Sequence, residues 1–385
     1  MKRLSTILAV AAMALGISGA KAQVQGVTDS EVLVGSHNDL SGPFAAFGSP
    51  AVKAAQLYFK EVNDKGGVHG RRIRFIVEDH TYQMPKATQA INKLINSDKV
   101  FAMLLSLGTP MNIAAFKLQD EKKIPNVAPL TSARQMLDPP NDYKFTGFSS
   151  YYDQTVGAVK YFNEKDKATK YCLMYIPSDF GLEIQQGAVD TIKKMNLTLT
   201  GETTHKPDEG DFVGPLSKHK DAGCEVIVHA LGVRQAITVS GTLKRMGWNA
   251  KLVGSSAGFN TVMAAVPGGV TEGLYAAAGW ADHVARMNVP EVKAWADGYK
   301  AAYNEDAGTG ALLGRSAAET FVRALQAAGK TLTPDTFKKG MESLKYTDAI
   351  TGAQIAFSEK DHEGAKDIII SQVQGGKWVE VHRVK

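Results

Sequence analysis

A strand–helix–strand stretch in the middle of the chain decides the fold class. It spans residues 171–202 and reads YCLMYIPSDFGLEIQQGAVDTIKKMNLTLTGE. The short apolar runs at Cys172–Ile176 and Leu197–Glu202 are typical of buried strands, and a helical pattern at Leu182–Met195 separates them. Two strands joined by a helix form a βαβ unit, which predicts a parallel sheet with helices on its faces.

The same alternation continues in both directions from this stretch. Further strands are predicted at Val32–Val34, Ile73–Val77, Val100–Leu105, Asn126–Ala128, Glu225–Ala230, Lys251–Val253 and Leu274–Ala277. Further helices are predicted at Tyr152–Glu164, Val213–Asp221, Arg234–Arg245, Pro290–Asn304, Leu312–Ala328 and Pro334–Ser343. Another helix has one buried face at Val52, Ala55, Phe59 and Val62, with Ser49 as its N-cap and Pro50 as its first residue. The pattern restarts after residue 150, which predicts two α/β lobes.

The last hundred residues are predicted to add helices and strands to both lobes. The final strands are expected to form a terminal antiparallel set at Ile355–Phe357, Ile368–Gln374 and Trp378–Val381. We therefore predict an N-terminal lobe from residues 23–147 plus 281–350, and a C-terminal lobe from residues 148–280 plus 351–385. Three glycines near the three crossings are hinge candidates or ordinary turn residues: Gly147, Gly279 and Gly352.

The N-terminus is predicted to be a cleavable signal peptide over residues 1–22. Lys2 and Arg3 precede an apolar run at Leu4–Ile17, and Ala20-Lys21-Ala22 supplies small residues for cleavage before Gln23. The alternative is a membrane-anchoring helix, but the apolar run is short for a hydrocarbon core of ~30 Å. The sequence therefore predicts a periplasmic protein.

Charge and cysteine content restrict the function classes. Without the three basic residues of the signal peptide, 41 of the 44 basic residues remain against 39 acidic ones, a balance that does not indicate nucleic acid as a partner. Cys172 and Cys224 open two predicted strands of the same half and are either a disulfide or two buried thiols. We find no Cys-x-x-Cys pair, no clustered histidines and no glycine-rich phosphate loop, so no metal or cofactor is expected.

Two hydroxyl-rich turns follow neighbouring predicted strands. Ligands of open parallel sheets bind beyond the carboxyl ends of the strands. The first turn contains Ser106, Leu107, Gly108 and Thr109. There Thr109 is predicted to cap the helix that Pro110 opens, and the N–H groups at the helix start suit a carboxylate. The second turn contains Leu130, Thr131 and Ser132. Ordinary helix capping is the alternative explanation for these hydroxyl groups.

Several motifs, in order, resemble a known family of transport proteins. They are residues 34–35 followed by 40–48 (VG and LSGPFAAFG), residues 62–70 (VNDKGGVHG), residues 178–181 (SDFG), Asp211-Phe212, and residues 252–254 (LVG). The chain resembles the branched-chain amino acid-type (Leu/Ile/Val-binding-like) solute-binding proteins of ABC transporters over essentially its whole mature length.

The resemblance implies a type I periplasmic-binding fold, with two Rossmann-like parallel-sheet lobes, a three-crossover hinge and a closing cleft. It implies that Phe47 and Phe180 close over the ligand, and that the two hydroxyl-rich turns hold the ligand carboxylate. It also implies ABC permease subunits in the inner membrane as partners and no enzyme activity. We expect a monomer.

One position departs from the family pattern. Amino-acid-binding members usually place an acidic residue after the strand end near Gly254, where it pairs with the ligand ammonium, whereas this chain has Ser255 and Ser256. A buried ammonium without a partner charge is costly. Asp179 or Asp282 are the available substitutes. The sequence favours an aromatic or other amine-free organic acid over an amino acid, with Phe47, Phe180 and Trp280 placed to stack on a ring.

Two other function classes are weighed against a transport protein. Residues 254–258 match the Gly-x-Ser-x-Gly elbow of hydrolases, with Asp282, His283 and His362 formally available to complete a triad. This short pattern arises often by chance. A ligand-sensing ectodomain that feeds a separate receptor is the second alternative.

Overall fold

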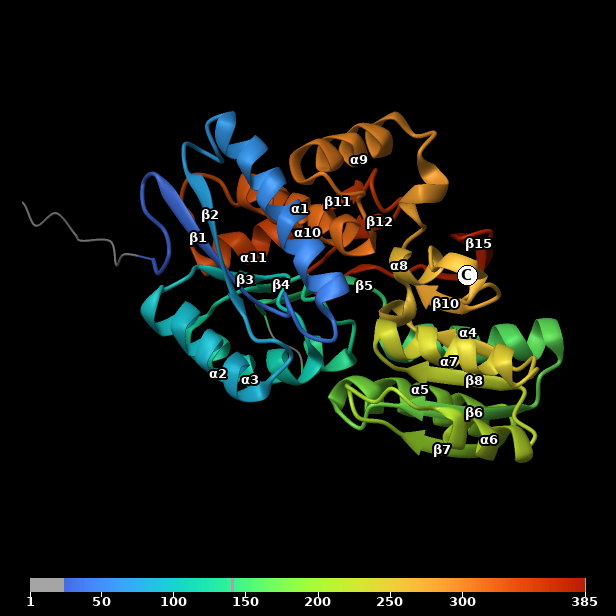
Figure 1. Cartoon of the computed structure of the whole chain (residues 1–385). Coiled ribbons are helices and arrows are strands. Elements are labelled where there is room, and N and C mark those ends of the chain that lie inside the picture. The colour runs from blue at the N-terminus through green and yellow to red at the C-terminus, as the bar shows by residue number, and fades with distance from the viewer. Residues whose placement is uncertain (1–23, 140–141, 385) are drawn as a thin grey trace, which may run out of the picture.

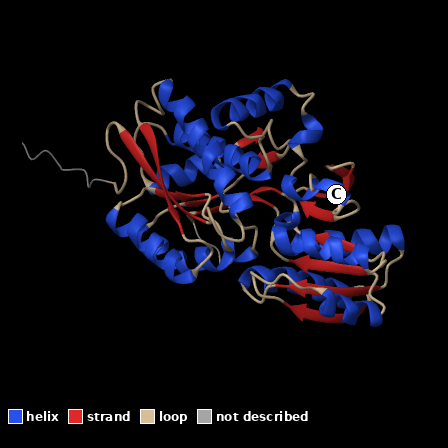
Figure 2. Cartoon of the chain, viewed as in Figure 1, coloured by secondary structure: helices blue, strands red, loops and turns tan. Residues whose placement is uncertain are grey.

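The computed structural model describes residues 24–139 and 142–384, which form two α/β lobes (Figure 1). The predicted signal peptide over residues 1–22 lies outside the described residues. Helices flank the strands in both lobes (Figure 2). The predicted fold class is confirmed, because each lobe is built on a mainly parallel sheet.

The first lobe contains a sheet whose strand order is β13-β5-β4-β3-β1-β2. All of its strand pairs are parallel. Its strands are β1 (Glu31–Asn38), β2 (Arg72–Asp79), β3 (Ala102–Leu104), β4 (Asn126–Val127), β5 (Lys144–Phe148) and β13 (Glu363–Ala365). Its helices are α1 (Ala45–Asp64), α2 (Met84–Asn92), α3 (Thr109–Lys122), α9 (Pro290–Tyr303), α10 (Thr309–Ala328) and α11 (Pro334–Glu342).

The second lobe contains a sheet whose strand order is β15-β14-β10-β9-β8-β6-β7. Only the pairs made by β14 are antiparallel. Its strands are β6 (Lys170–Tyr175), β7 (Thr198–Thr204), β8 (Val226–Ala230), β9 (Lys251–Gly254), β10 (Tyr275–Ala278), β14 (Ile368–Gln374) and β15 (Lys377–Val384). Its helices are α4 (Tyr151–Asp166), α5 (Asp179–Lys194), α6 (Val213–Asp221), α7 (Val233–Arg245) and α8 (Thr261–Ala264).

The chain crosses between the lobes three times, and the third crossing differs from the prediction. β13 pairs in parallel with β5 of the first lobe, and β14 then pairs with β10 of the second. The crossing therefore lies between Ala365 and Ile368, and the predicted lobe boundary at residue 351 is wrong. The physical reason is burial, because Ile355, Phe357 and Ala365 pack into the apolar core of the first lobe.

The segment before this crossing forms a small hairpin instead of joining the terminal strands. β11 (Lys345–Thr347) pairs antiparallel with β12 (Gln354–Ala356) in a separate two-stranded sheet. Gly352 has a φ of +73° in the hairpin turn, where its N–H donates to the carbonyl oxygen of Asp348 at 2.8 Å. The hinge assignment of Gly352 is wrong. Gly147 and Gly279 remain at the first and second crossings.

Helix α1 begins five residues before the predicted first residue, Pro50, so the capping role of Ser49 is also wrong. Pro50 lies inside the helix and has no N–H for the carbonyl oxygen of Ala46. The side-chain amide of Asn260 in the second lobe donates to that oxygen at 3.3 Å. The missing helical hydrogen bond is thus replaced by a bond between the lobes.

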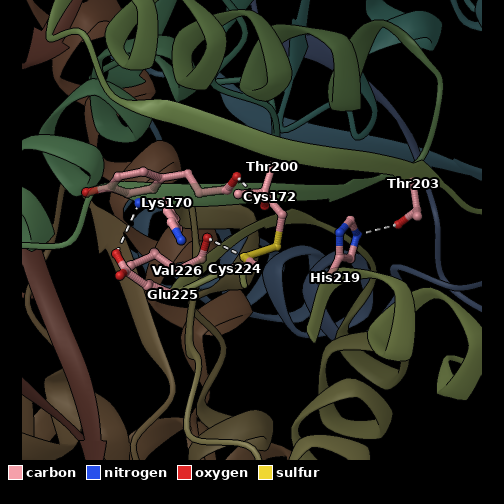
Figure 3. Close-up of a disulfide and its surroundings, with 9 residues drawn as sticks. Lys170, Cys172, Thr200, Thr203, His219, Cys224, Glu225 and Val226 are labelled. Atoms are coloured by element: carbon pink, nitrogen blue, oxygen red, sulfur yellow. Dashed lines mark hydrogen bonds between the residues drawn. A yellow bond between two sulfur atoms is a disulfide. The ribbon is translucent and has the colours of Figure 1, made fainter. Parts of the chain in front are cut away.

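The second lobe carries a disulfide between Cys172 and Cys224, which decides between the two alternatives left by the sequence (Figure 3). Cys172 lies on β6 and Cys224 lies just before β8. These two strands are hydrogen-bonded neighbours, so the cysteines approach each other although they are 52 residues apart in the sequence. Both side chains are buried.

Candidate ligand-binding site

A cavity lies at the carboxyl ends of the first-lobe strands and is closed on its other side by the second lobe. It encloses about 910 Å³ including its opening to solvent. The lining residues are Phe44, Phe47, Tyr82, Leu105, Leu107, Gly108, Thr109, Ala128, Pro129, Leu130, Thr131, Ser132, Gly147, Phe148, Tyr151, Phe180, Ser256, Ala257, Trp280, Leu313, Ser316, Ala317, Thr320, Ile355 and Phe357.

The two hydroxyl-rich turns form one continuous wall of this cavity. The Thr109 and Thr131 hydroxyl oxygens are 2.7 Å apart and share a hydrogen bond. Behind them, the backbone N–H of Leu130 donates to the carbonyl oxygen of Ser106 at 2.9 Å. The two turns are therefore fixed relative to each other by side-chain and backbone bonds.

Helix α3 begins at this wall, but Thr109 does not cap it as predicted. The helix starts at Thr109 itself, and the N-cap position is Gly108, with a φ of +101° and no side-chain hydrogen bond. This φ favours glycine, because residues with a Cβ rarely adopt that backbone conformation. The first N–H groups of a helix have no helical acceptor, so this end of α3 favours an anion.

Aromatic side chains from both lobes also line the cavity. The rings of Phe44 and Tyr82 in the first lobe have centroids 4.4 Å apart. Phe180, on α5 of the second lobe, approaches Phe44 edge-on at 6.0 Å and Tyr151 at 5.6 Å. Phe180 thus packs against the first lobe across the mouth of the cavity, a geometry suited to apolar or aromatic ligands.

A charge-assisted contact also joins the two lobes. Arg134 of the first lobe donates from Nε to Glu183 Oε1 at 2.8 Å, and its backbone N–H donates to the same oxygen at 3.0 Å. The Glu183 side chain, on α5, is only 3 % exposed. The guanidinium also lies 3.7 Å from the ring centroid of Tyr152. The lobes are therefore in contact around the cavity.

Two helix starts also pair with each other across the lobe boundary. The backbone N–H of Thr261, at the start of α8 in the second lobe, donates to the Thr309 hydroxyl at 3.0 Å. The backbone N–H of Thr309, at the start of α10 in the first lobe, donates to the Thr261 hydroxyl at 2.9 Å. Each helix therefore satisfies an otherwise free N–H of the other across the lobe boundary.

The cavity lining contains no aspartate, glutamate, lysine, arginine or histidine. Burial raises the pKa of Tyr151 to about 12, although hydrogen bonds from Thr131 and the Ser132 backbone act in the opposite direction. The phenol therefore stays protonated at physiological pH. The indole Nε1 of Trp280 is buried and has no hydrogen-bond acceptor within the described part of the chain. The site therefore offers neutral donors and no partner for a cation.

Ten of the eleven predicted contact residues line this cavity, and Ser106 does not. Ser106 is fully buried behind the wall, where its carbonyl oxygen supports both Leu130 and the side chain of Asn112. Neither Asp179 nor Asp282 lines the cavity. The sequence predictions missed the aromatic residues Phe44, Tyr82, Phe148 and Tyr151. Phe44 lies inside the motif at residues 40–48, so that motif could have identified it as a cavity residue.

The described residues contain neither a candidate metal site nor a membrane-spanning helix. Across residues 24–139 and 142–384, no three or more His, Cys, Asp or Glu side chains gather in a way that could hold a metal ion. In the same ranges, no helix has the length and apolar character needed to cross a membrane. The backbone N–H of Ser256 donates to the side chain of Gln154 at 2.8 Å, which fixes this turn against α4.

Comparison with known proteins identifies the family. The family model described as periplasmic binding protein matches residues 31–377. The Leu/Ile/Val-binding protein homolog 1 of Brucella abortus is 24% identical over 337 residues, covering 86% of this chain and 87% of that protein. The chain belongs to the periplasmic binding protein family, and its resemblance to the branched-chain amino acid-binding members is confirmed.

Solved structures agree with this assignment. A fatty acid ABC transporter substrate-binding protein from Thermomonospora curvata superposes with a TM-score of 0.85, at 25% identity over 94% of this chain and 93% of that one. A branched-chain amino acid ABC transporter protein from Thermus thermophilus with bound valine superposes with a TM-score of 0.84, at 23% identity over 92% and 96% of the two chains. The chain is thus a solute-binding protein of the ABC transporter type, a non-enzymatic class, and the hydrolase alternative is set aside.

Proposed function

We propose that this protein is the periplasmic solute-binding component of an ABC importer and captures a small carboxylate that has no ammonium group. It acts as a monomer after removal of a signal peptide, and it delivers its ligand to permease subunits in the inner membrane. An aromatic or other organic acid is the favoured ligand. The alternatives are a branched-chain or other amino acid for the same kind of importer, and a ligand-sensing role.

The observation that carries this proposal is the uncharged lining of the cavity. Desolvating an ammonium group costs several kcal/mol when no carboxylate compensates it. A carboxylate, in contrast, is satisfied by neutral N–H and O–H donors at a helix start. The donors are at hand in the first N–H groups of α3, the Tyr151 hydroxyl and the free indole N–H of Trp280.

Capture proceeds by lobe closure. The first lobe supplies the hydroxyl wall and therefore receives the carboxylate in the open form. Phe180 and Trp280 of the second lobe line the cavity together with the first-lobe residues. A ligand that contacts both lobes only in the closed form shifts the open–closed equilibrium toward it. The closed form is then the state that a permease recognises.

Matched acids test the proposal directly. We expect 3-phenylpropanoate to bind at least about 100-fold more tightly than phenylalanine, which differs from it only by the amino group, because the lining cannot compensate an ammonium. 4-Methylpentanoate is likewise expected to bind more tightly than leucine, which differs from it only by the amino group. Isothermal titration calorimetry gives each affinity, and 3-phenylpropan-1-ol serves as the control without a carboxylate.

Two outcomes would contradict the proposal. Tighter binding of the amino acids would move the assignment to the amino-acid alternative. Equal binding of the alcohol and the acid would remove the carboxylate from the recognition. Native mass spectrometry of protein purified without refolding adds an independent check, since a co-purified ligand is identified by its mass.

A further inference from the structure

The cavity does not end at the cleft between the lobes but continues into the first lobe along helix α10. Leu313, Ser316, Ala317 and Thr320 all line it, at positions i, i+3, i+4 and i+7 of one helix face. Seven residues of α-helix rise about 10 Å. The cavity is therefore elongated along α10, beyond the space that a carboxylate and one ring occupy at the cleft.

Six residues define this inner part, which we call the first-lobe channel: Leu105, Ala128, Ala317, Thr320, Ile355 and Phe357. Ala317, Ile355 and Phe357 are members of the first-lobe apolar core. The channel is thus a gap in packed apolar side chains. A gap of this kind costs stability when it stays empty, because its lining loses dispersion contacts.

The backbone at the channel floor is unusual. Leu105 and Ala128, at the ends of the adjacent strands β3 and β4, have φ angles of +57° and +43°. Residues other than glycine rarely adopt this left-handed conformation, and such strain gathers at ligand sites. Both residues line the channel.

Close packing elsewhere holds α10 in place and leaves the channel open. Gly314 of α10 lies against α1, where an added Cβ would meet the carbonyl oxygen of Ala51 at 2.0 Å. That glycine contact fixes α10 against α1. On the channel side, the small side chains of Ala128 and Ala317 provide the room.

The inner end of the channel offers no free polar group to a ligand. The Thr320 hydroxyl donates to the carbonyl oxygen of Ser316 at 3.0 Å and lies 2.7 Å from the Tyr346 hydroxyl. No charged side chain lines this end. A ligand chain that reaches Thr320 is therefore apolar to its tip.

We infer that the site takes monocarboxylates with an extended, unbranched apolar chain, and that the chain lies in the first-lobe channel while the carboxylate lies at the Thr109–Thr131 wall. This inference rests on the proposed function and narrows its ligand class. It separates the two ends of the ligand, because N–H and O–H donors lie at one end of the cavity and mainly apolar side chains, none of them charged, lie at the other.

The test is a chain-length series on the unmodified protein. Isothermal titration calorimetry with butanoate, hexanoate and octanoate is expected to show tightening of about 15-fold for each added pair of methylene groups, as burial of each methylene contributes about fourfold. Octanedioate is expected to bind at least about 100-fold more weakly than octanoate, because its second carboxylate would be desolvated at an uncharged end.

A variant with a filled channel provides a second test. Ala317→Leu places a larger side chain in the channel and is expected to abolish the gain from butanoate to octanoate while butanoate still binds. Ala327→Leu, at an exposed position on the same helix, is the matched control and is expected to keep the full gain.

The outcomes separate this inference from the function on which it rests. If butanoate and 3-phenylpropanoate bind but affinity stays flat along the series, or if Ala317→Leu keeps the chain-length gain, the channel inference is overturned and the proposed function stands. If no acid binds while amino acids do, the proposed function itself fails. If Ala317→Leu does not fold, the series on the unmodified protein still decides.

Discussion

The two lobes share one architecture but make unequal contributions to the ligand cavity. The second lobe contributes Tyr151, Phe180, Ser256, Ala257 and Trp280, and the first lobe contributes all the remaining lining residues. The hydroxyl wall and the channel both lie in the first lobe. Most of the lining therefore belongs to the first lobe, which supports the proposal that the second lobe closes over a ligand held by the first.

The lobes also differ in how their cores are secured. The second lobe has the disulfide between β6 and β8, whereas the described residues of the first lobe contain no cysteine. The first lobe instead contains an apolar channel that a ligand can fill. We therefore expect the second lobe to be stable without ligand, and the first lobe to gain most from binding.

Removal of the disulfide is expected to have the largest effect and to act on one lobe. The double variant Cys172→Ala, Cys224→Ala should lower the free energy of unfolding of the second lobe by about 4 kcal/mol, because a cross-link over 52 residues restricts the unfolded chain. Hydrogen exchange measured by mass spectrometry resolves the two lobes. Equal loss of protection in both lobes would show that the disulfide does not stabilise the second lobe alone.

Loss of the lid aromatic is expected to weaken binding without unfolding either lobe. Phe180→Ala should reduce the affinity for 3-phenylpropanoate about 30-fold, because a buried phenylalanine side chain contributes roughly 2 kcal/mol. Leu182→Ala, an exposed position on the same helix, is the control. Unchanged affinity in Phe180→Ala would remove this residue from the site.

Acid is expected to destabilise both lobes through buried histidines. Burial, with a smaller effect of His80, lowers the pKa of His37 in the first lobe to about 3, and burial lowers the pKa of His229 in the second lobe to about 4. The unfolded chain binds a proton near pH 6.5 and the folded lobe does not. The stability present above this pH is therefore lost as the pH falls toward the folded-state pKa values.

The expected size is about 2 kcal/mol per histidine at pH 5 relative to pH 7. Urea unfolding followed lobe by lobe at the two pH values measures it. His37→Gln should reduce the pH dependence of the first lobe only, and His229→Gln that of the second lobe only. A pH dependence that neither variant changes would show that other groups carry it.

The smallest effect is expected for the contact between Arg134 and Glu183, which joins the two lobes. Glu183→Gln keeps the shape of the side chain but removes the charge that Arg134 meets across the mouth. Because charge-assisted bonds exceed neutral ones by about 1 kcal/mol, ligand affinity should fall about fivefold through weaker closure. Glu164→Gln, an exposed carboxylate of the same lobe, is the control. A similar fall in the control would assign the effect to net charge.

Local patterns in the sequence predicted most of the fold and much of the candidate site. Apolar runs and helical spacing are properties of short segments, so they located helices such as α6 and α9 to within one residue. The hydroxyl-rich turns were found because parallel strands bring their carboxyl ends to one edge. The short strand β5 was missed, as its residues Lys144–Phe148 lack a clear apolar run.

The tertiary structure decided the features that depend on residues far apart in the chain. Arg134 and Glu183 are 49 residues apart, and nothing in either local segment predicts their contact. The third crossing was decided by burial of Ile355 and Phe357 in the first-lobe core, which a strand pattern alone does not reveal.

By itself, the sequence determined the family, the two α/β lobes and the hydroxyl turns, because backbone preference and apolar periodicity act over a few residues. The uncharged lining of the cavity, its extent along α10 and the share of each lobe in it became visible only in the folded molecule. These properties arise from packing between segments that the chain brings together only after folding.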